Sequence, residues 1–149
     1  MTRINLVDPK QLTYKHLLAE YKELPRVFTH ILKAHKAGKT IDDYKLPERY
    51  TIGKGHVTFF YNKAHYLWWR WENICLTLEM ERGTKLTKSV VDKVERDYIN
   101  LPLWARWATY EPTPEEIYLN MYRLSNRLFF GEDMDVNDQQ VLEKMKEPL

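Results

Sequence analysis

Two residues near the start of the chain combine a free amine with a phosphate-binding cation. A small residue at position 2 normally allows the initiator methionine to be removed, so we expect Thr2 to lead the mature chain. A chain-terminal amine has a pKa of about 7.7–8.0, so far more of it is unprotonated near neutral pH than of a lysine with pKa about 10.4. Such an amine is a ready nucleophile for imine chemistry. Arg3 beside it could hold a phosphate next to the attacked group.

Four cations are expected on one side of the first long helix. At about 100° per residue they fall within a narrow sector and form a stripe about 27 Å long. These residues are Lys15, Lys22, Arg26 and Lys33. The stripe suits a row of backbone phosphates, although an ordinary solvated face is the simpler interpretation of the stripe alone.

Glu23 and His16 share a side of that helix, about 80–100° around from the stripe. A carboxylate on a phosphate-binding surface repels the ligand, so its presence needs a reason. One reason is an ion pair with Lys22 or Arg26, worth a few tenths of a kcal/mol. Another is a carboxylate that stabilises a positively charged sugar intermediate, as in glycoside cleavage. His16 is either a phosphate contact or a helix-surface histidine.

The elements that position these groups are predicted to be helices. Apolar residues recur with helical period from Leu12 to about Lys36, and Pro25 predicts a kink because it biases Leu24 away from helical geometry. A second helix is expected over about 63–82, between the caps Asn62 and Gly83, and a shorter one over 88–98. Residues 38–61 lack periodicity and are expected to form a long loop. The tryptophans of the second helix divide, with Trp68 and Trp71 expected inside and Trp69 more exposed, and His56 is expected in the core.

A last long helix is predicted to begin at TPEE, residues 113–116, which has the pattern of a capping box with proline at the first helical position. Its expected apolar stripe is Ile117, Met121, Leu124 and Leu128. Arg123 and Arg127 are four residues apart on its polar face and form a second candidate phosphate clamp.

Composition and charge narrow the class of protein. Residues 1–90 carry 16 Lys and Arg against 9 Asp and Glu, whereas residues 91–149 carry 7 against 12, so the first part suits a polyanionic partner. The single cysteine excludes a disulfide framework, and no cluster has metal-ligand spacing. We expect an all-α protein: one compact domain of three main helices with long connecting loops and an extended N-terminal segment. Its expected extent is residues 1–131, followed by an acidic extension at 132–149. A cytoplasmic monomer without cofactor, metal or membrane segment is expected.

Three collinear segments resemble the bacteriophage-type pyrimidine-dimer DNA glycosylase family, also called endonuclease V of the pyrimidine-dimer type. They are MTRINL at the start, HLLAEYKELPRVF at 16–28 and GKGHVTFFYNK at 53–63. The resemblance is close over residues 1–63 and looser beyond. It implies a DNA repair enzyme that acts on ultraviolet-induced cyclobutane pyrimidine dimers in double-stranded DNA, as a glycosylase and an abasic-site lyase.

The resemblance also implies roles for individual residues. The α-amine of Thr2 would attack the anomeric carbon of the dimer's 5′ nucleotide and form an imine, after which β-elimination cuts the strand. Glu23 matches the family's essential carboxylate. The residues matching its phosphate, lesion and DNA contacts are Arg3, His16, Arg26, Arg123 and Arg127. Lys22 stands where the family's best-known member has arginine, which keeps the charge but loses bidentate phosphate contact.

Two other functions fit the same sequence. One is a helical DNA-binding module whose basic stripe docks on phosphates without chemistry. The other is a related glycosylase and lyase that prefers oxidised bases or abasic sites. The binding module requires neither a free amine at Thr2 nor a carboxylate at Glu23.

Overall fold

The computed structural model describes residues 2–130, with side chains described as far as residue 125, and within this range the chain forms helices and no strand. The α-helices are α1 (Tyr14–Glu23), α2 (Pro25–Lys36), α3 (Ala64–Met80), α4 (Lys88–Ile99), α5 (Leu103–Arg106) and α6 (Pro114–Phe130). Three 3-10 helices span Pro9–Gln11, Ile41–Asp43 and Thr58–Phe60. The all-α class and the single domain are therefore confirmed. None of the described helices is long and apolar enough to cross a membrane.

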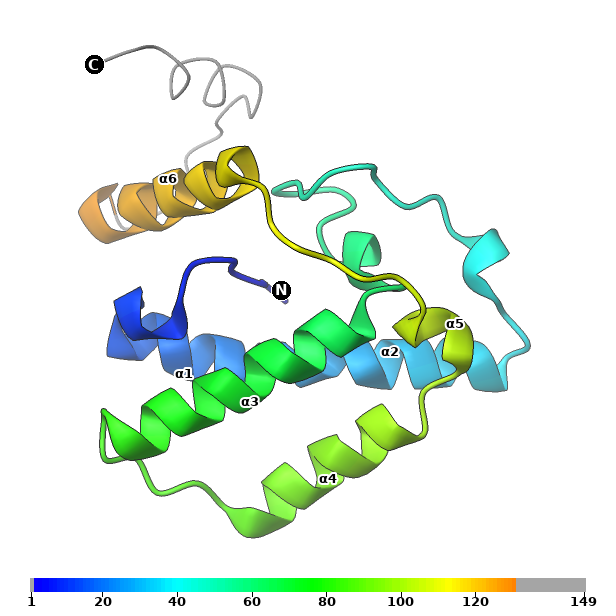
Figure 1. Cartoon of the computed structure of the whole chain (residues 1–149), viewed down its shortest axis with the longest axis horizontal. Helices are drawn as coiled ribbons and strands as arrows, with labels where there is room; N and C mark the ends of the chain where they lie inside the picture. Colours follow the sequence, from blue (N-terminus) through cyan, green and yellow to red (C-terminus); the bar gives the residue numbers. More distant parts are fainter. Residues whose placement is uncertain (1, 131–149) are drawn as a thin grey trace.

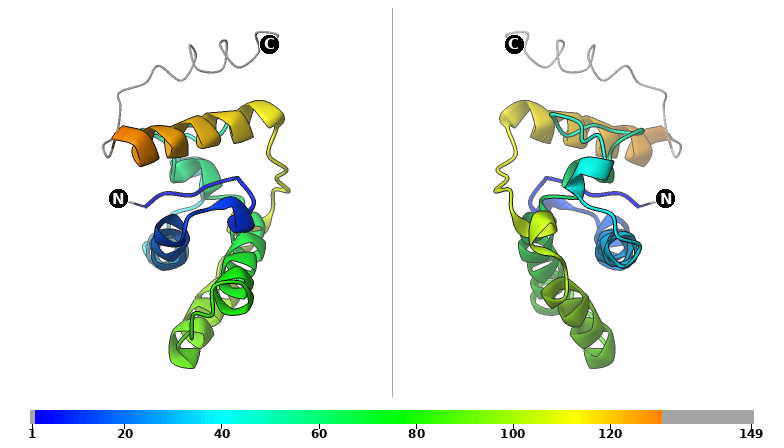
Figure 2. Two further views of the ribbon diagram at one scale, coloured as in Figure 1. Left: turned by 90° about the vertical axis from the view of Figure 1, so that its left-hand side faces the viewer. Right: turned by 90° about the vertical axis from the view of Figure 1, so that its right-hand side faces the viewer.

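The N-terminal segment lies between helices α1 to α4 on one side and helix α6 on the other. Helices α1 and α2 run end to end, α3 packs against α1, and α4 packs against α2 (Figure 1). Helix α6 lies on the opposite side of the N-terminal segment (Figure 2). The predicted acidic extension at 132–149 lies outside the described residues.

The first predicted helix is interrupted at Pro25, but the expected kink mechanism is wrong. Leu24 keeps helical angles, with φ −55° and ψ −44°, so α2 continues the direction of α1. Proline has no N–H to donate to the carbonyl of Tyr21, four residues earlier. The indole Nε1 of Trp71 donates to that carbonyl instead, at 3.0 Å. A contact from α3 thus satisfies the group that the proline leaves without its helical partner.

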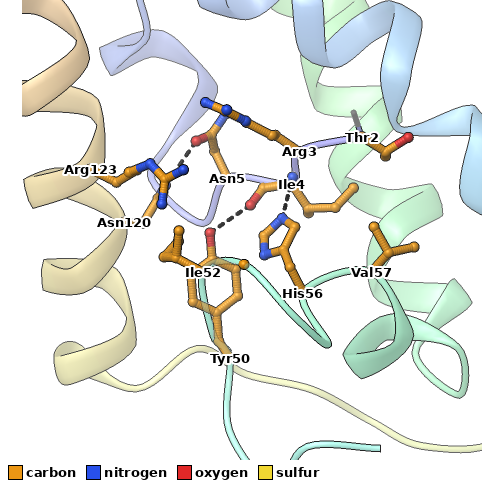
Figure 3. Close-up of a pocket in the computed structure, with 11 residues that line it drawn as sticks. Thr2, Arg3, Ile4, Asn5, Tyr50, Ile52, His56, Val57, Asn120 and Arg123 are labelled. Atoms are coloured by element: carbon orange, nitrogen blue, oxygen red, sulfur yellow. Dashed lines mark hydrogen bonds between the residues drawn. The ribbon is translucent and has the colours of Figure 1, made fainter. Parts of the chain in front are cut away.

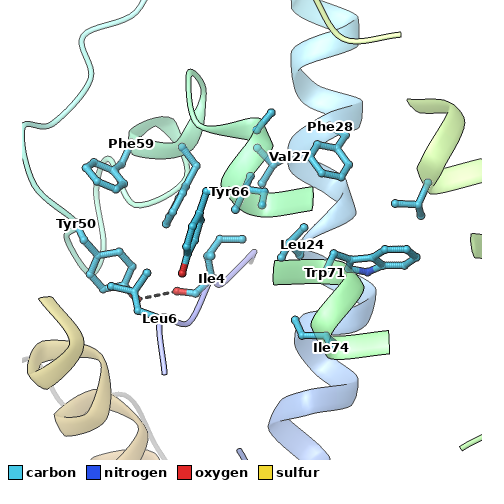
Figure 4. Close-up of a cluster of buried hydrophobic side chains, with 14 of the residues drawn as sticks. Ile4, Leu6, Leu24, Val27, Phe28, Tyr50, Phe59, Tyr66, Trp71 and Ile74 are labelled. Atoms are coloured by element: carbon cyan, nitrogen blue, oxygen red, sulfur yellow. Dashed lines mark hydrogen bonds between the residues drawn. The ribbon is translucent and has the colours of Figure 1, made fainter. Parts of the chain in front are cut away.

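The apolar core joins α1, α2 and α3 to the N-terminal segment and to the loop before α3 (Figure 4). Its fully buried members include Ile4, Leu24, Phe28, Phe60 and Trp71. Trp68 is half-buried and stacks on both Trp71 and Tyr98, whereas Trp69 is 59% exposed. The predicted division of the tryptophans is confirmed.

The start of α6 is the predicted capping box. The Thr113 hydroxyl accepts from the Glu116 amide at 3.2 Å, and Glu116 Oε1 accepts from the Thr113 amide at 3.0 Å. The second oxygen of Glu116 accepts from the Tyr50 amide at 2.6 Å, so this cap also fastens the long loop to α6.

Four details of the predicted elements are wrong. The loop over 38–61 contains two 3-10 helices, α5 was not predicted, and α3 has Lys63 rather than Asn62 at its N-cap position. In α6, Met121 is 46% exposed, and the buried residues among those with described side chains are Glu116, Leu119 and Asn120. Ile117 and Leu124 are partly buried and pack against the core, as expected. The inner face of α6 also carries Asn120 and Glu116, which bond to the N-terminal segment and to the loop, so only Met121 departs from the described part of the expected stripe. Its predicted member Leu128 lies outside the described side chains.

A buried ion pair links α1 to α3. Arg70 and Glu20 are each 2% exposed, and Arg70 donates to Glu20 through Nε and, at 3.0 Å, through Nη2. Arg70 Nη1 also donates to the carbonyl of Val7 at 2.8 Å. One guanidinium therefore ties two helices and the N-terminal segment together.

We predict that Arg70→Met lowers the free energy of unfolding by about 3–5 kcal/mol, because it leaves the Glu20 carboxylate buried and uncompensated. The double variant Arg70→Met with Glu20→Leu is expected to lose less, since it removes both charges. Urea unfolding measures both, with the exposed Arg96→Met on α4 as the control. A loss below 1 kcal/mol for Arg70→Met would contradict the role given to this pair.

Candidate active site

The N-terminal segment, residues 2–8, is extended and runs between α6 on one side and α1 and α3 on the other (Figures 1 and 2). Residues 2–130 contain no strand that could lie beside it, so its backbone N–H and C=O groups have no sheet ladder to join. A buried backbone group without a partner is costly, and nearly all such groups in folded proteins are paired. In this segment, side chains from other elements supply the partners.

The first half of the segment is held by α1 and by the loop before α3. The amide of Arg3 donates to Glu23 Oε1 at 3.1 Å, and the amide of Ile4 donates to His56 Nε2 at 2.8 Å. The Tyr50 hydroxyl donates to the carbonyl of Ile4 at 2.7 Å (Figure 3).

The second half is held by α6. Asn120 is 1% exposed, and its Oδ1 accepts from the amides of both Leu6 and Val7, at 2.7 and 3.2 Å. Its Nδ2 donates to Asn5 Oδ1 at 2.8 Å, and Asn5 in turn donates to Glu20 at 2.8 Å. One asparagine thereby couples α6 through the segment to α1.

Thr2 lies at the end of this segment, close to the carboxylate predicted to act with it. The residue is 8% exposed and lines a cavity of about 110 Å³ together with Tyr50, His56 and Arg123 (Figure 3). Glu23 bonds to the amide that directly follows Thr2. The structure therefore brings together two groups that are 21 positions apart in the sequence.

A second hollow adjoins the same segment and gathers four of the predicted site residues from three elements. It is lined by Arg3, by His16 and Glu23 of α1, and by Arg123 of α6. All four are half-buried, so each presents part of its side chain to this hollow and part to the protein. The arrangement is a carboxylate surrounded by groups able to contact phosphate.

Burial changes the acid–base properties of this hollow. Burial raises the pKa of Glu23, and the nearby Arg26 partly opposes this effect. Burial, assisted by Lys15, lowers the pKa of His16, with Glu20 opposing. A carboxyl whose pKa is raised exchanges protons more readily near neutral pH.

The remaining predicted cations lie along the outer surface of α1 and α2. Because Leu24 stays helical, the angular spacing carries across Pro25 and the stripe is continuous. All four of its members, Lys15, Lys22, Arg26 and Lys33, are exposed. Arg127 lies one turn after Arg123 on α6, and its side chain is outside the described ones.

Sequence reasoning missed Glu20, Arg70 and Asn120. A signal existed for the first two, since Glu20 lies between Leu17 and Leu24 on the apolar face of its helix, and Arg70 sits among the inward residues of α3. Charged residues at such positions usually have a buried partner. His56 is buried, as predicted, but the sequence did not indicate what it contacts. Across residues 2–130, no three His, Cys, Asp or Glu side chains are arranged to hold a metal ion.

Comparison with known families fits this helical site with its threaded N-terminus. The family model described as pyrimidine dimer DNA glycosylase matches residues 1–92. The chain belongs to the pyrimidine dimer DNA glycosylase family, a family of DNA repair enzymes that act on ultraviolet-damaged DNA. The matched residues include the N-terminal segment, α1 to α3 and His56, whereas α5 and α6 lie beyond them.

We predict that Asn120→Leu detaches the N-terminal segment from α6, because two buried amides lose their acceptor. An unsatisfied buried group costs about 1–3 kcal/mol, so the free energy of unfolding should fall by at least that amount. Hydrogen exchange of the Leu6 and Val7 amides should accelerate. The exposed Ser125→Ala on the same helix is the control. Unchanged exchange at both amides would show that Asn120 does not hold the segment.

Proposed function

We propose that this protein is a bifunctional DNA glycosylase and abasic-site lyase for cyclobutane pyrimidine dimers, with the Thr2 amine as its nucleophile. After Met1 is removed, the amine lone pair bonds to C1′ of the dimer's 5′ nucleotide. The electrons of the N-glycosyl bond leave with the base, which takes up a proton. The sugar ring opens to an imine, a proton is lost from C2′, and the 3′ phosphate departs by β-elimination.

One observation chiefly supports this proposal in a chain of this family. The Glu23 carboxylate lies 3.1 Å from the amide next to Thr2, on a segment whose backbone is fixed by side chains. A sugar attacked by the amine would lie beside this carboxylate. Glu23 would stabilise the positive charge that develops on the sugar and then transfer protons during imine formation and elimination.

The cations would hold the damaged strand. We assign DNA-backbone contacts to two groups, the residues of the second hollow and those of the stripe on α1 and α2. Arg3, His16 and Arg123 belong to the first, with Arg127 following on α6; Lys15, Lys22, Arg26 and Lys33 belong to the second. Such contacts fix register without reading sequence. The duplex must deform to expose the sugar, at a cost of a few kcal/mol that is smaller at a damaged pair.

Borohydride trapping on dimer-containing duplex tests the chemistry, because borohydride reduces an imine to a stable covalent adduct. Protein shown by mass spectrometry to begin at Thr2 should form the adduct and cut the strand. Glu23→Gln should lower trapping by about 10²-fold or more. One residue appended before Thr2 should abolish it. The exposed Glu79→Gln on α3 is the matched control.

Other outcomes of that experiment would replace the proposal. An adduct formed only with abasic DNA would indicate a related enzyme for other lesions. Salt-sensitive binding of dimer-containing DNA without any adduct would indicate a DNA-binding module.

We predict that the stripe contributes sequence-independent affinity. Replacing Lys22 or Lys33 by Ala should weaken binding to undamaged duplex and reduce the slope of log K against log salt by about 1 for each lost phosphate contact. Lys88→Ala at the start of α4 is a matched control, since it removes an exposed lysine outside the stripe. Equal slopes for the stripe variants and the control would show that the stripe is an ordinary solvated face.

A further inference from the structure

His56 contacts the N-terminal segment but has no part in the chemistry above. It is 8% exposed, in the loop between α2 and α3. Its Nε2 lies 2.8 Å from the amide nitrogen of Ile4, and its Nδ1 lies 2.7 Å from the carbonyl oxygen of Thr51. An amide can only donate and a carbonyl can only accept. The two partners therefore require a neutral imidazole with its proton on Nδ1.

The loop holds this ring in one orientation. Gly53 and Gly55 have φ of +98° and +87°, and the His56 amide donates to the Gly53 carbonyl at 3.0 Å. A Cβ on Gly55 would lie 2.7 Å from Cγ of Pro47, so this turn accepts glycine alone without rearrangement. The imidazole meets the rings of Tyr50 and Phe60 edge to face, at centroid distances of 5.2 and 6.1 Å.

The same loop forms hydrogen bonds with both backbone groups of Ile4. His56 accepts from its amide, and Tyr50, six positions earlier, donates to its carbonyl (Figure 3). Thr2 is two positions before Ile4. The residue between them, Arg3, is also held, because its amide donates to Glu23. The hydrogen bonds to Ile4 therefore determine where Thr2 lies relative to the Glu23 carboxylate.

We propose that His56 is a positioning residue, whose neutral imidazole fixes the N-terminal segment so that the amine of Thr2 is held beside Glu23. A proton added at Nε2 would turn the acceptor into a donor facing the Ile4 amide, and the segment would be released. This inference rests on the proposed amine chemistry for its effect on catalysis. The hold on Ile4 itself can be measured without DNA.

Burial sets the direction of the pH dependence of His56, and neighbouring groups modify it. Burial lowers the pKa of His56; the bond to Thr51 and the Glu20 carboxylate of α1 oppose this, and Arg123 of α6 adds to it. Arg3 of the segment lines the same cavity. The released state, with an ordinary pKa of about 6.5, binds more protons than the held state. The hold is therefore complete above about pH 6.5 and is lost as pH falls through the lower pKa of the held state.

Nitrogen-15 NMR of the histidine ring tests the tautomer directly. At neutral pH, His56 should be neutral, with its proton on Nδ1, and the Ile4 amide should be protected from hydrogen exchange. As the pH falls below about 6.5, protection of Ile4 should begin to weaken, and it should be lost as His56 becomes protonated at its lowered pKa. A proton on Nε2 at neutral pH would overturn the inference. So would hydrogen-exchange protection of the Ile4 amide that does not change when the His56 imidazole is protonated.

Two variants connect this hold to catalysis. His56→Phe keeps a ring in the aromatic cluster but provides no acceptor, so exchange at Ile4 should accelerate and trapping should fall by about 10²-fold. His56→Gln can offer an oxygen acceptor that does not titrate, and it should retain most trapping while losing the acid-side release of Ile4. The exposed His35→Phe on α2 is the control.

The outcomes separate this inference from the proposed function. If the unmodified protein forms no adduct, the amine chemistry fails, while exchange at Ile4 still reports on the hold. If His56→Phe traps like the parent and Ile4 stays protected, the positioning role fails while the chemistry stands. If His56→Phe does not fold, the positioning role is tested by the tautomer of His56 and by the pH dependence of Ile4 hydrogen exchange in His56→Gln.

Discussion

The structure depends on burying an extended stretch of backbone that has no strand beside it. Residues 3 to 7 pass through the interior, where each unpaired N–H or C=O would cost about 1–3 kcal/mol. Side chains of Glu23, His56, Tyr50, Asn120 and Arg70 supply the partners. They come from four different parts of the chain, so satisfying the segment also fixes how α1, α3, α6 and the long loop sit around it.

This constraint also bears on the proposed amine chemistry at Thr2. Termini are usually poorly ordered, and an amine on a loose end would lose the advantage of defined geometry. Here hydrogen bonds from other elements hold the segment as far as the amide of Arg3. In the proposed function, preorganisation of this kind would remove an entropic cost from the encounter with a reacting sugar, which is the general benefit of holding reactive groups in place.

The two carboxylates of α1 acquire different properties from their surroundings. Glu20 is fully buried and is engaged by Arg70 and Asn5, so its charge is neutralised inside the protein. Glu23, three positions later, is half-buried, contacts the segment and lines the hollow with Arg3 and His16. One carboxylate therefore links α1 to α3, while the other lines the second hollow.

The sequence by itself determined the longer helices, the capping box of α6, the spacing of the basic stripe and the division of the tryptophans, because these follow from local periodicity and neighbouring residues. The family also followed from contiguous segments. Only the tertiary structure decided that Leu24 stays helical, that α6 turns Asn120 inward and that His56 grips Ile4. The contacts involved join residues 50 to 114 positions apart. Periodicity shows which face of a helix is buried, but a hydrogen-bond partner at that distance depends on how every intervening element packs.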